Sequence, residues 1–363
     1  MDSQVFLSIV IPTRNRPKSL PFSVKSALNL IQTIPGEVIV VSNGQSLASD
    51  LSGLDEETHN KCVIVRSDER LSLSQNWAFG FRQCRGEWIT LLGDDDILDF
   101  KDGNRLHQFL AETAESGIRF RSGSFRWAQD GEYIPNSFLS PKVTKEIKRL
   151  ETPSSDKKWH ELQPRNYPCG AGASLLRKTW IDDLDSKGLL FSAFSPDWFT
   201  ASLFIYAFSS YIQIEEIWAF TGEHPFSAMA QQRDPNGRIA KEELKLNPYS
   251  PHALLQFKEA IYPTTWLARM DSLIRAREIN NLPSELKEKE FIKSALRTTP
   301  RYIFKVRPKL FNQFPDHKVT INLFSIVFLP GSIFRSISRI FKVQFGIGFR
   351  RKSEVLGSLF RTQ

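Results

Sequence analysis

Short apolar runs alternate with stretches of helical periodicity through the N-terminal part of the chain. Four apolar runs predict buried β-strands: residues 6–11 (FLSIVI), 37–41 (EVIVV), 62–66 (CVIVR) and 88–92 (WITLL). Between them, apolar residues recur at helical spacing, which predicts helices over 20–31 and 73–81. Strands that alternate with helices predict an α/β fold around a mostly parallel central sheet.

The pattern changes further along the chain. Residues 118–127 and 211–220 predict two more strands, and Gln129–Glu132 predicts a hairpin turn. Ser140–Gln163 is polar and lysine-rich without a clear period, so we expect either a loop over a site or an insertion. Beyond residue 230 helical patterns dominate. We therefore expect a catalytic domain over 1–230 and a mainly helical C-terminal region over 231–363.

Three polar loops follow the predicted strands, at residues 12–17, 42–46 and 93–96. In an open parallel sheet, ligands bind at the carboxyl ends of the strands. The sequence therefore predicts one binding site formed by these three loops.

The loop after the fourth strand contains three consecutive acids, Asp94, Asp95 and Asp96. Adjacent carboxylates repel one another unless a cation offsets their charge. Hard oxygen ligands suit Mg²⁺ or Mn²⁺, and these ions in turn suit a diphosphate. The alternative is a solvated acidic turn in which Asp96 caps the next helix.

The order and spacing of several motifs resemble a known enzyme family. SIVIPTRNRPKSL, VIVVSNGQS and LSQNWAFGFRQCRGEWITLLGDDDIL are similar to the opening of inverting glycosyltransferases of family 2, GT-A type. The resemblance implies a GT-A fold, Rossmann-like with helices on both sides of the sheet. The family commonly has an acidic pair after the second strand, where this chain has Ser42 and Asn43. Asn43 can still hydrogen-bond the edge of a base, so the departure is compatible with nucleotide binding.

The resemblance also implies a nucleotide-sugar donor, with UDP as the expected nucleotide. The residues that would bind it are Pro12, Thr13, Arg14, Asn15, Asn43, Arg70, Asn76, Asp94 and Asp95. Arg14 or Arg16 would lie near phosphate. Each has a simpler explanation: a solvated loop for the arginines, a turn for Asn43, and capping or surface positions for Arg70 and Asn76.

A divalent cation, Mn²⁺ or Mg²⁺, would assist departure of the nucleoside diphosphate. Asp95 is the first choice of ligand, with Asp96 as a possible second. The family's late histidine corresponds to His224, which lies on a loop between a glycine-containing turn and a proline. The alternative for His224 is an ordinary surface residue.

The catalytic base that the resemblance implies is Asp197, just before a strongly apolar helix, where an acid can also serve as a helix cap. Trp198 would stack on a sugar or belong to the core. Gly170 and Gly172 would lie beside the donor sugar and the acceptor, a glycan or a lipid-linked saccharide. A tight strand entry explains these glycines equally well.

Charge and cysteine content refine this picture. The chain has a net charge of +8, but residues 301–363 contain 12 Lys and Arg against 2 Asp and Glu, so the basic character belongs to the tail. Within it, 332–345 predicts a basic amphipathic helix for an anionic membrane surface or for docking on the catalytic domain. Three scattered cysteines, and no predicted signal peptide or transmembrane span, favour a cytoplasmic protein. A membrane-binding tail would place it peripherally at the inner face of the plasma membrane.

Three other functions compete with glycosyl transfer. A sugar-phosphate nucleotidyltransferase would need a glycine-rich loop after the first strand, and PTRNRP has no glycine. A catalytically dead carbohydrate-binding scaffold would be expected to lose the acids, yet Asp94–Asp96 and Asp197 are present. Nucleic-acid binding is not expected, because the apolar residues interleaved in the basic tail suit lipid or protein better than a phosphate backbone.

Overall fold

The fold is seen in a computed structural model of the chain. It describes residues 5–43, 46–100, 102–128, 130–135, 137–141, 144–153, 168–170, 172–224, 245–249, 265–284, 316 and 349–350. The basic amphipathic segment 332–345 lies outside the described residues. Among the helices that can be described, none combines the length and the hydropathy needed to cross a membrane.

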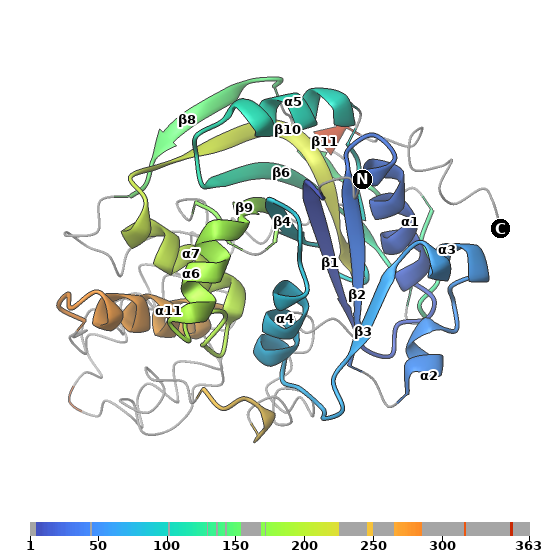
Figure 1. Ribbon diagram of the computed structural model, residues 1–363, viewed down its shortest axis with the longest axis horizontal. Coiled ribbons are helices and arrows are strands. Elements are labelled where there is room, and N and C mark those ends of the chain that lie inside the picture. The colour runs from blue at the N-terminus through green and yellow to red at the C-terminus, as the bar shows by residue number, and fades with distance from the viewer. Residues whose placement is uncertain are drawn as a thin grey trace.

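A central nine-stranded sheet runs through the molecule in the order β3-β2-β1-β4-β9-β6-β10-β5, with β8 also paired to β10 (Figure 1). Strands β3, β2, β1, β4, β6 and β10 share one direction, while β9, β5 and β8 run against them. The expected α/β fold with a mostly parallel sheet is therefore confirmed.

The first four strands coincide closely with the predicted apolar runs. They are β1 (Leu7–Thr13), β2 (Gly36–Ser42), β3 (Val63–Arg66) and β4 (Trp88–Leu91). The run was expected to stop before Pro12, but β1 continues through it to Thr13. The reason is that the pairing with β4 ends at Val10, so β1 needs no N–H toward that side beyond this point.

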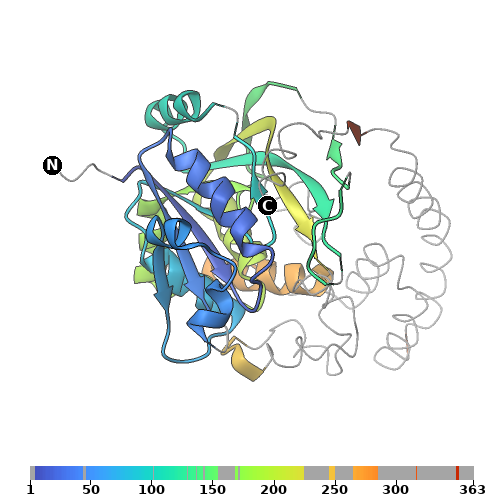
Figure 2. The same cartoon turned by 90° about the vertical axis from the view of Figure 1, so that its right-hand side faces the viewer.

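Helices cover both faces of the sheet (Figures 1 and 2). On one face, α1 (Leu20–Ile31) and α5 (Gly103–Glu112) pack on alternate β1 residues, Leu7 and Ile9 among them. On the other, α4 (Leu73–Arg82), α6 (Lys178–Ser186) and α7 (Pro196–Ala207) pack on Val10 and its neighbours. The short helices α2 (Leu47–Leu51) and α3 (Glu56–Asn60) follow β2.

Helix α4 approaches the sheet closely through small residues. A Cβ on Gly80 would lie 2.6 Å from Val41 and 2.7 Å from Val10. Ser74, Ala78 and Phe81 are buried, whereas Leu73 and Trp77, which the spacing groups with Phe81, are only half-buried. The predicted helix is thus confirmed, but the face that it buries differs from the expected one.

The second half of the sheet is built on β6 (Gly117–Arg126) and β10 (Ser210–Glu223). The predicted hairpin turn after β6 is confirmed, because Ala128 N–H donates to the Glu132 carbonyl at 2.7 Å. The short strands β5 (Ile97–Leu98) and β9 (Ser174–Arg177) complete this part.

A strand lies in the segment where no regular structure was expected. Within 140–163, β8 (Ile147–Glu151) pairs antiparallel with β10. It is an edge strand in which only Leu150 is partly buried, so its sequence lacks the alternation that reveals a half-buried strand. Just before it, β7 (Ser140–Pro141) pairs with β11 (Phe349–Arg350) near the C-terminus. Residues 142–143 and 154–163 of the predicted loop are outside the described part.

One helix from beyond residue 230 packs directly on the part of the chain described above. Helix α11 (Thr265–Ile279) lies against α7, with Met270, Leu273 and Ile274 buried. Ser272 Oγ donates to the Ser195 carbonyl at 3.4 Å. The proposed division of the chain at residue 230 stays a prediction.

Candidate active site

Asp94 anchors the acidic loop to the end of β1. Its Oδ2 accepts hydrogen bonds from Thr13 Oγ1 at 2.8 Å and from Arg14 N–H at 3.3 Å. Two of the predicted nucleotide-binding loops are therefore joined by direct contacts.

Asp96 does not cap the following helix, so this part of the alternative is wrong. The N-cap of α5 is Asp102, whose Oδ1 accepts from Arg105 N–H at 3.0 Å. Asp96 Oδ1 instead accepts from Gly222 N–H at 2.8 Å, which ties the acidic loop to the end of β10. The Asp96 carbonyl accepts from Ser23 Oγ of α1 at 2.6 Å.

Asp95 is held through both its main chain and its carboxylate. Trp127 Nε1 donates to the Asp95 carbonyl at 2.9 Å, and Asp95 Oδ2 lies 3.7 Å from Arg16 Nη1. A Cβ on Gly222 would come within 1.8 Å of the Asp95 carbonyl oxygen, so only glycine fits there. Sequence reasoning missed Trp127 and Gly222, although a glycine at a strand end is a signal of close backbone approach.

The acidic loop is not a solvated turn. The Asp95 side chain is 13% exposed, as is that of Arg16, which also excludes a solvated loop for this arginine. Burial raises the pKa of all three carboxyls: it raises that of Asp95 well above its usual range, with the Asp96 and Asp94 charges adding to the effect, and that of Asp96 to about 6. Arg16 opposes the rise at Asp94 and Asp95.

His224 is buried rather than a surface residue, and it lies near this loop. Its ring centroid is 6.3 Å from that of Trp127. Burial and the Arg16 charge lower the pKa of His224 to about 4, so the imidazole is neutral at pH 7, the form in which histidine binds metals. Among the described residues, however, no group of three or more His, Cys, Asp or Glu side chains is arranged to hold a metal ion.

Asn43, the residue predicted to contact the nucleotide base, makes two hydrogen bonds to Leu71. Asn43 Nδ2 donates to the Leu71 carbonyl at 2.9 Å, and Asn43 Oδ1 accepts from Leu71 N–H at 3.0 Å. This amide fixes the segment that carries the exposed Arg70 against the end of β2. A contact between Asn43 and the nucleotide base stays a prediction. The Asn43 amide would then have to bind both the base and the Leu71 main chain.

Asn76 is neither a cap nor a surface residue. It is buried within α4, whose capping box is formed by Ser72 and Gln75. Within the described part of the chain, the buried Asn76 Oδ1 has no hydrogen-bond partner. Pro12 is partly buried at the end of β1, and Asn15 is exposed beyond it.

Asp197 lies in the first turn of α7 and is not its N-cap, which is Ser195. Ser195 Oγ donates to Asp197 Oδ1 at 2.9 Å, and the carboxyl is only partly buried. Burial raises the pKa of Asp197, opposed by hydrogen bonds from the Trp198 N–H and from Ser195. A raised pKa makes the carboxylate a better proton acceptor.

The two glycines differ in their surroundings. A Cβ on Gly170 would lie 3.0 Å from the Asp197 carbonyl oxygen, so this glycine serves close backbone packing against α7. A Cβ on Gly172 would meet nothing within 4 Å. Gly172 bridges Leu91 of β4, close to the acidic loop. Trp198 is partly exposed, and the Arg269 guanidinium of α11 lies 5.7 Å from its ring centroid.

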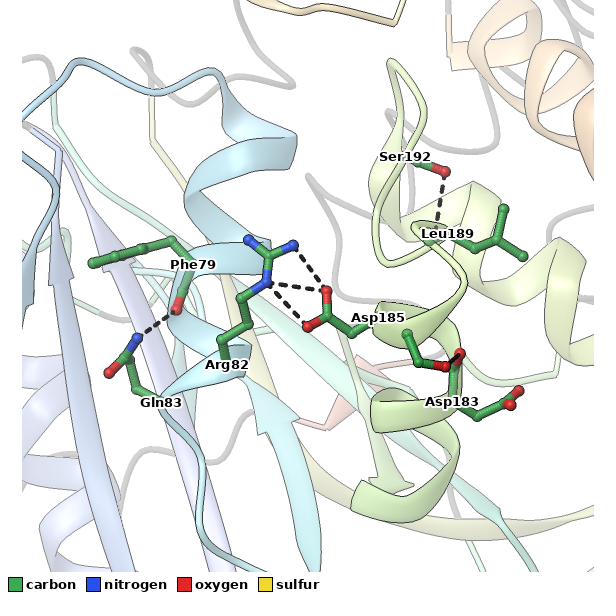
Figure 3. Close-up of polar contacts among 8 residues, drawn as sticks. Phe79, Arg82, Gln83, Asp183, Asp185, Leu189 and Ser192 are labelled. Carbon is green, nitrogen blue, oxygen red and sulfur yellow. Dashed lines mark hydrogen bonds and ion pairs between the residues drawn. The ribbon is translucent and has the colours of Figure 1, made fainter.

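Helix α4 is fixed to the unit that carries Asp197. Arg82 and Asp185 of α6 form a bidentate ion pair, with Nη2–Oδ1 at 2.8 Å and Nε–Oδ2 at 3.1 Å (Figure 3). Ser74 Oγ donates to the Ala193 carbonyl, in the segment that leads to Asp197. These contacts join the donor side of the predicted site to the segment that carries the predicted base.

Two of the predicted loops are thus joined by direct contacts at one end of an α/β sheet, and a family model gives the class. Residues 8–184 match the model described as Glycosyl transferase family 2. This segment belongs to that family, and the chain is a glycosyltransferase. The nucleotidyltransferase alternative is thereby set aside.

Solved structures of TarS from S. aureus resemble the chain distantly. TarS 1–349 in complex with UDP has 14% identity and a TM-score of 0.47, over 90% of this chain and 92% of that chain. The same fragment in complex with UDP-GlcNAc has 14% identity and a TM-score of 0.41, over 90% of each chain. No curated protein matches the chain. Because the TM-scores are below 0.5, the assignment depends on the family model.

The raised pKa of Asp95 predicts a pH-dependent cost to stability. Its folded-state pKa lies well above the usual 3.8. Protonated Asp95 therefore makes its full contribution to stability below pH 3.8, and this contribution is lost as the pH rises through the folded-state pKa. In EDTA, Asp95→Asn should match wild type near pH 4 and exceed its unfolding free energy by on the order of 1 kcal/mol at pH 7. Urea unfolding across this range measures the difference.

The exposed Asp68 provides the control, and Asp68→Asn should follow wild type at every pH. Wild-type and Asp95→Asn curves that run parallel from pH 4 to pH 7 would contradict the electrostatic cost.

Proposed function

We propose that the chain transfers a sugar from a nucleoside-diphosphate sugar, with UDP the expected nucleotide, to a hydroxyl of a glycan or lipid-linked acceptor, inverting the anomeric centre. One observation carries this proposal: carboxylates occupy two separately built places. Asp94–Asp96 are bound into the ends of β1 and β10, while Asp197 lies in the first turn of α7. Donor binding and proton transfer require such a separation of roles.

The acidic loop and the arginines suit an anionic diphosphate only if the charges are balanced. Arg16 supplies positive charge beside Asp95 and acts on Asp94 as well, and Arg14 is the further candidate for the phosphates. A divalent cation would offset the remaining repulsion, and hard carboxylate oxygens suit it. Mg²⁺ is commonly held by one or two carboxylates together with substrate phosphates, which fits a loop that offers no three-ligand cage among the described residues.

Asp95 is therefore the proposed ligand of Mn²⁺ or Mg²⁺, with Asp96 and His224 as further candidates. When bound, the cation would stabilise negative charge on the departing diphosphate. Pro12, Thr13, Arg14, Asn15 and Asn43 would line the nucleotide, with Arg70 and Asn76 beyond them. Gly170, Gly172 and Trp198 would border the sugar and the acceptor.

The proposed reaction is a single displacement. Asp197 accepts the proton of the acceptor hydroxyl as its oxygen attacks the anomeric carbon. The new glycosidic C–O bond forms while the C–O bond to the diphosphate breaks, and the nucleoside diphosphate leaves with the electron pair. Attack from the face opposite the leaving group inverts the anomeric centre.

Nucleotide binding is the first test. Calorimetric titration with UDP, GDP, CDP and dTDP should show binding of one nucleotide that is stronger with Mn²⁺ than in EDTA, because the cation links the diphosphate to Asp95. Asp95→Asn should remove most of this metal-dependent gain. The exposed Asp68→Asn is the control and should bind as wild type does.

Failure of the folded wild type to bind any of the four nucleotides would favour the dead-scaffold alternative. Equal nucleotide binding in Mn²⁺ and in EDTA would contradict the metal assignment and leave the proposal of nucleotide binding in place.

The role of Asp197 predicts a loss of rate without a loss of donor binding. Asp197→Asn keeps the size of the side chain and removes the proton acceptor, so kcat should fall by about 10²–10⁴-fold. The Kd for the nucleoside diphosphate should stay within about twofold of wild type. Asp185→Asn, at the nearby α4–α6 ion pair, controls for general disturbance. An Asp197→Asn enzyme with wild-type kcat would rule out this base.

The basic tail is proposed to bind an anionic membrane surface. In 332–345 the residues Ile333, Phe334, Ile337, Ile340 and Phe341 share one helical face, with basic residues beside it. This proposal rests on the sequence alone. Docking of the tail on the catalytic domain is the alternative.

Sedimentation with liposomes tests the tail. The full chain should sediment with vesicles containing phosphatidylglycerol and not with purely zwitterionic ones, since lysine and arginine supply the attraction. Changing Arg335, Arg339 and Lys342 to Gln should weaken sedimentation while leaving nucleotide binding intact. Unchanged sedimentation of this variant would count against the proposal.

A further inference from the structure

Asp50 is a fully buried carboxylate between two of the predicted nucleotide-binding loops. It belongs to the short helix α2 that follows β2. Its Oδ2 accepts a hydrogen bond from Ser42 Oγ at 2.7 Å, and its Oδ1 accepts from Asn15 N–H, also at 2.7 Å. One side chain thus connects the end of β2 to the loop after β1.

The residue that Asp50 holds has an unfavourable backbone conformation. Asn15 has a φ of 56°, in the left-handed region that costs an L-residue free energy. The two residues before it, Thr13 and Arg14, are bonded to Asp94. Segment 13–15 is therefore held by two carboxylates from different elements, Asp94 on one side and Asp50 on the other.

We infer that Asp50 is a positioning residue for the nucleotide donor: it fixes Asn15 and Ser42 in the arrangement that the nucleotide meets. The inference rests on the proposed function. Hydrogen bonds to a carboxylate are stronger than those to a neutral acceptor, so the loop is ordered before the ligand arrives. A pre-ordered loop reduces the entropy that binding would otherwise cost. Asp50 itself need not touch the nucleotide.

The chain contains a matched control for a purely structural role. Glu37 lies near the other end of β2 and is also buried. Its Oε1 accepts from Ser8 Oγ at 2.7 Å and from Arg85 N–H at 2.8 Å. Asp50 and Glu37 thus each accept from one serine hydroxyl and one main-chain amide, at opposite ends of β2. Glu37 also pairs with the Arg85 guanidinium, with Nε–Oε2 at 2.9 Å. Only Asp50 is at the end where the nucleotide is proposed to bind.

The experiment compares Asp50→Asn with Glu37→Gln. Each keeps the side-chain size and replaces one acceptor oxygen by an amide, so both should lower the urea midpoint. Calorimetry with the nucleotide of the UDP, GDP, CDP and dTDP panel that wild type binds should give about tenfold or greater weakening for Asp50→Asn. Glu37→Gln should bind within about twofold of wild type. In turnover, Asp50→Asn should raise the donor KM and leave the acceptor KM unchanged.

Two outcomes overturn the inference while leaving the proposed function in place. One is wild-type affinity in Asp50→Asn, and the other is equal weakening in Asp50→Asn and Glu37→Gln, which would reduce Asp50 to a structural acid. Failure of wild type to bind any nucleotide in the panel would overturn the proposed function, and this inference with it.

If Asp50→Asn does not fold, Ser42→Ala provides the same test. It removes one hydrogen-bond donor and leaves the bond to Asn15, so a weakening of several-fold is expected. Unchanged nucleotide affinity in Ser42→Ala would then overturn the inference.

Discussion

Three neighbouring carboxylates are largely shielded from bulk water at the end of β4, and contacts from several surrounding elements hold them in place. Burial and mutual repulsion both oppose their ionisation. The chain compensates with hydrogen bonds to the carboxylates from Thr13 and Arg14 at the end of β1 and from Gly222 of β10. Ser23 of α1 and Trp127 after β6 hold the main chain of the same loop. Such an arrangement is costly without a cation or an anionic ligand complex to complete it, which is why it is better explained by function than by folding.

Much of the architecture could be predicted from local sequence pattern. The apolar runs 37–41 and 62–66 became β2 and β3, but only β2 lies buried between two neighbouring strands. Strand β3 is an edge strand that pairs with β2 alone and is not buried, so the expectation of a buried strand was wrong there. Strand β8 escaped prediction because four of its five residues are exposed and it carries no periodic signal. The extension of β1 through Pro12 depended on where its neighbour β4 ends, which only the assembled sheet reveals.

The site could be predicted as a set of loops but not as a network. Asp94–Asp96 and Asp197 could be predicted as site residues because they directly adjoin an apolar strand and an apolar helix in the sequence. Trp127, Gly222 and Asp50 did not, because their importance depends on contacts to residues distant in sequence or on a backbone approach that no local pattern encodes. The contact of Arg269 with Trp198 likewise required α11 to fold onto α7, so part of the C-terminal region contributes to the environment of the predicted acceptor side.

The exposed character of β8 has a consequence for how copies of the protein behave toward one another. A sheet ends in unpaired N–H and C=O groups, which another chain can use to extend it. At this edge the strand IKRLE presents Lys148, Arg149 and Glu151 to solvent. An incoming strand would have to desolvate these charges or set them against its own. The segment that looked least informative in sequence therefore protects the sheet against association edge to edge.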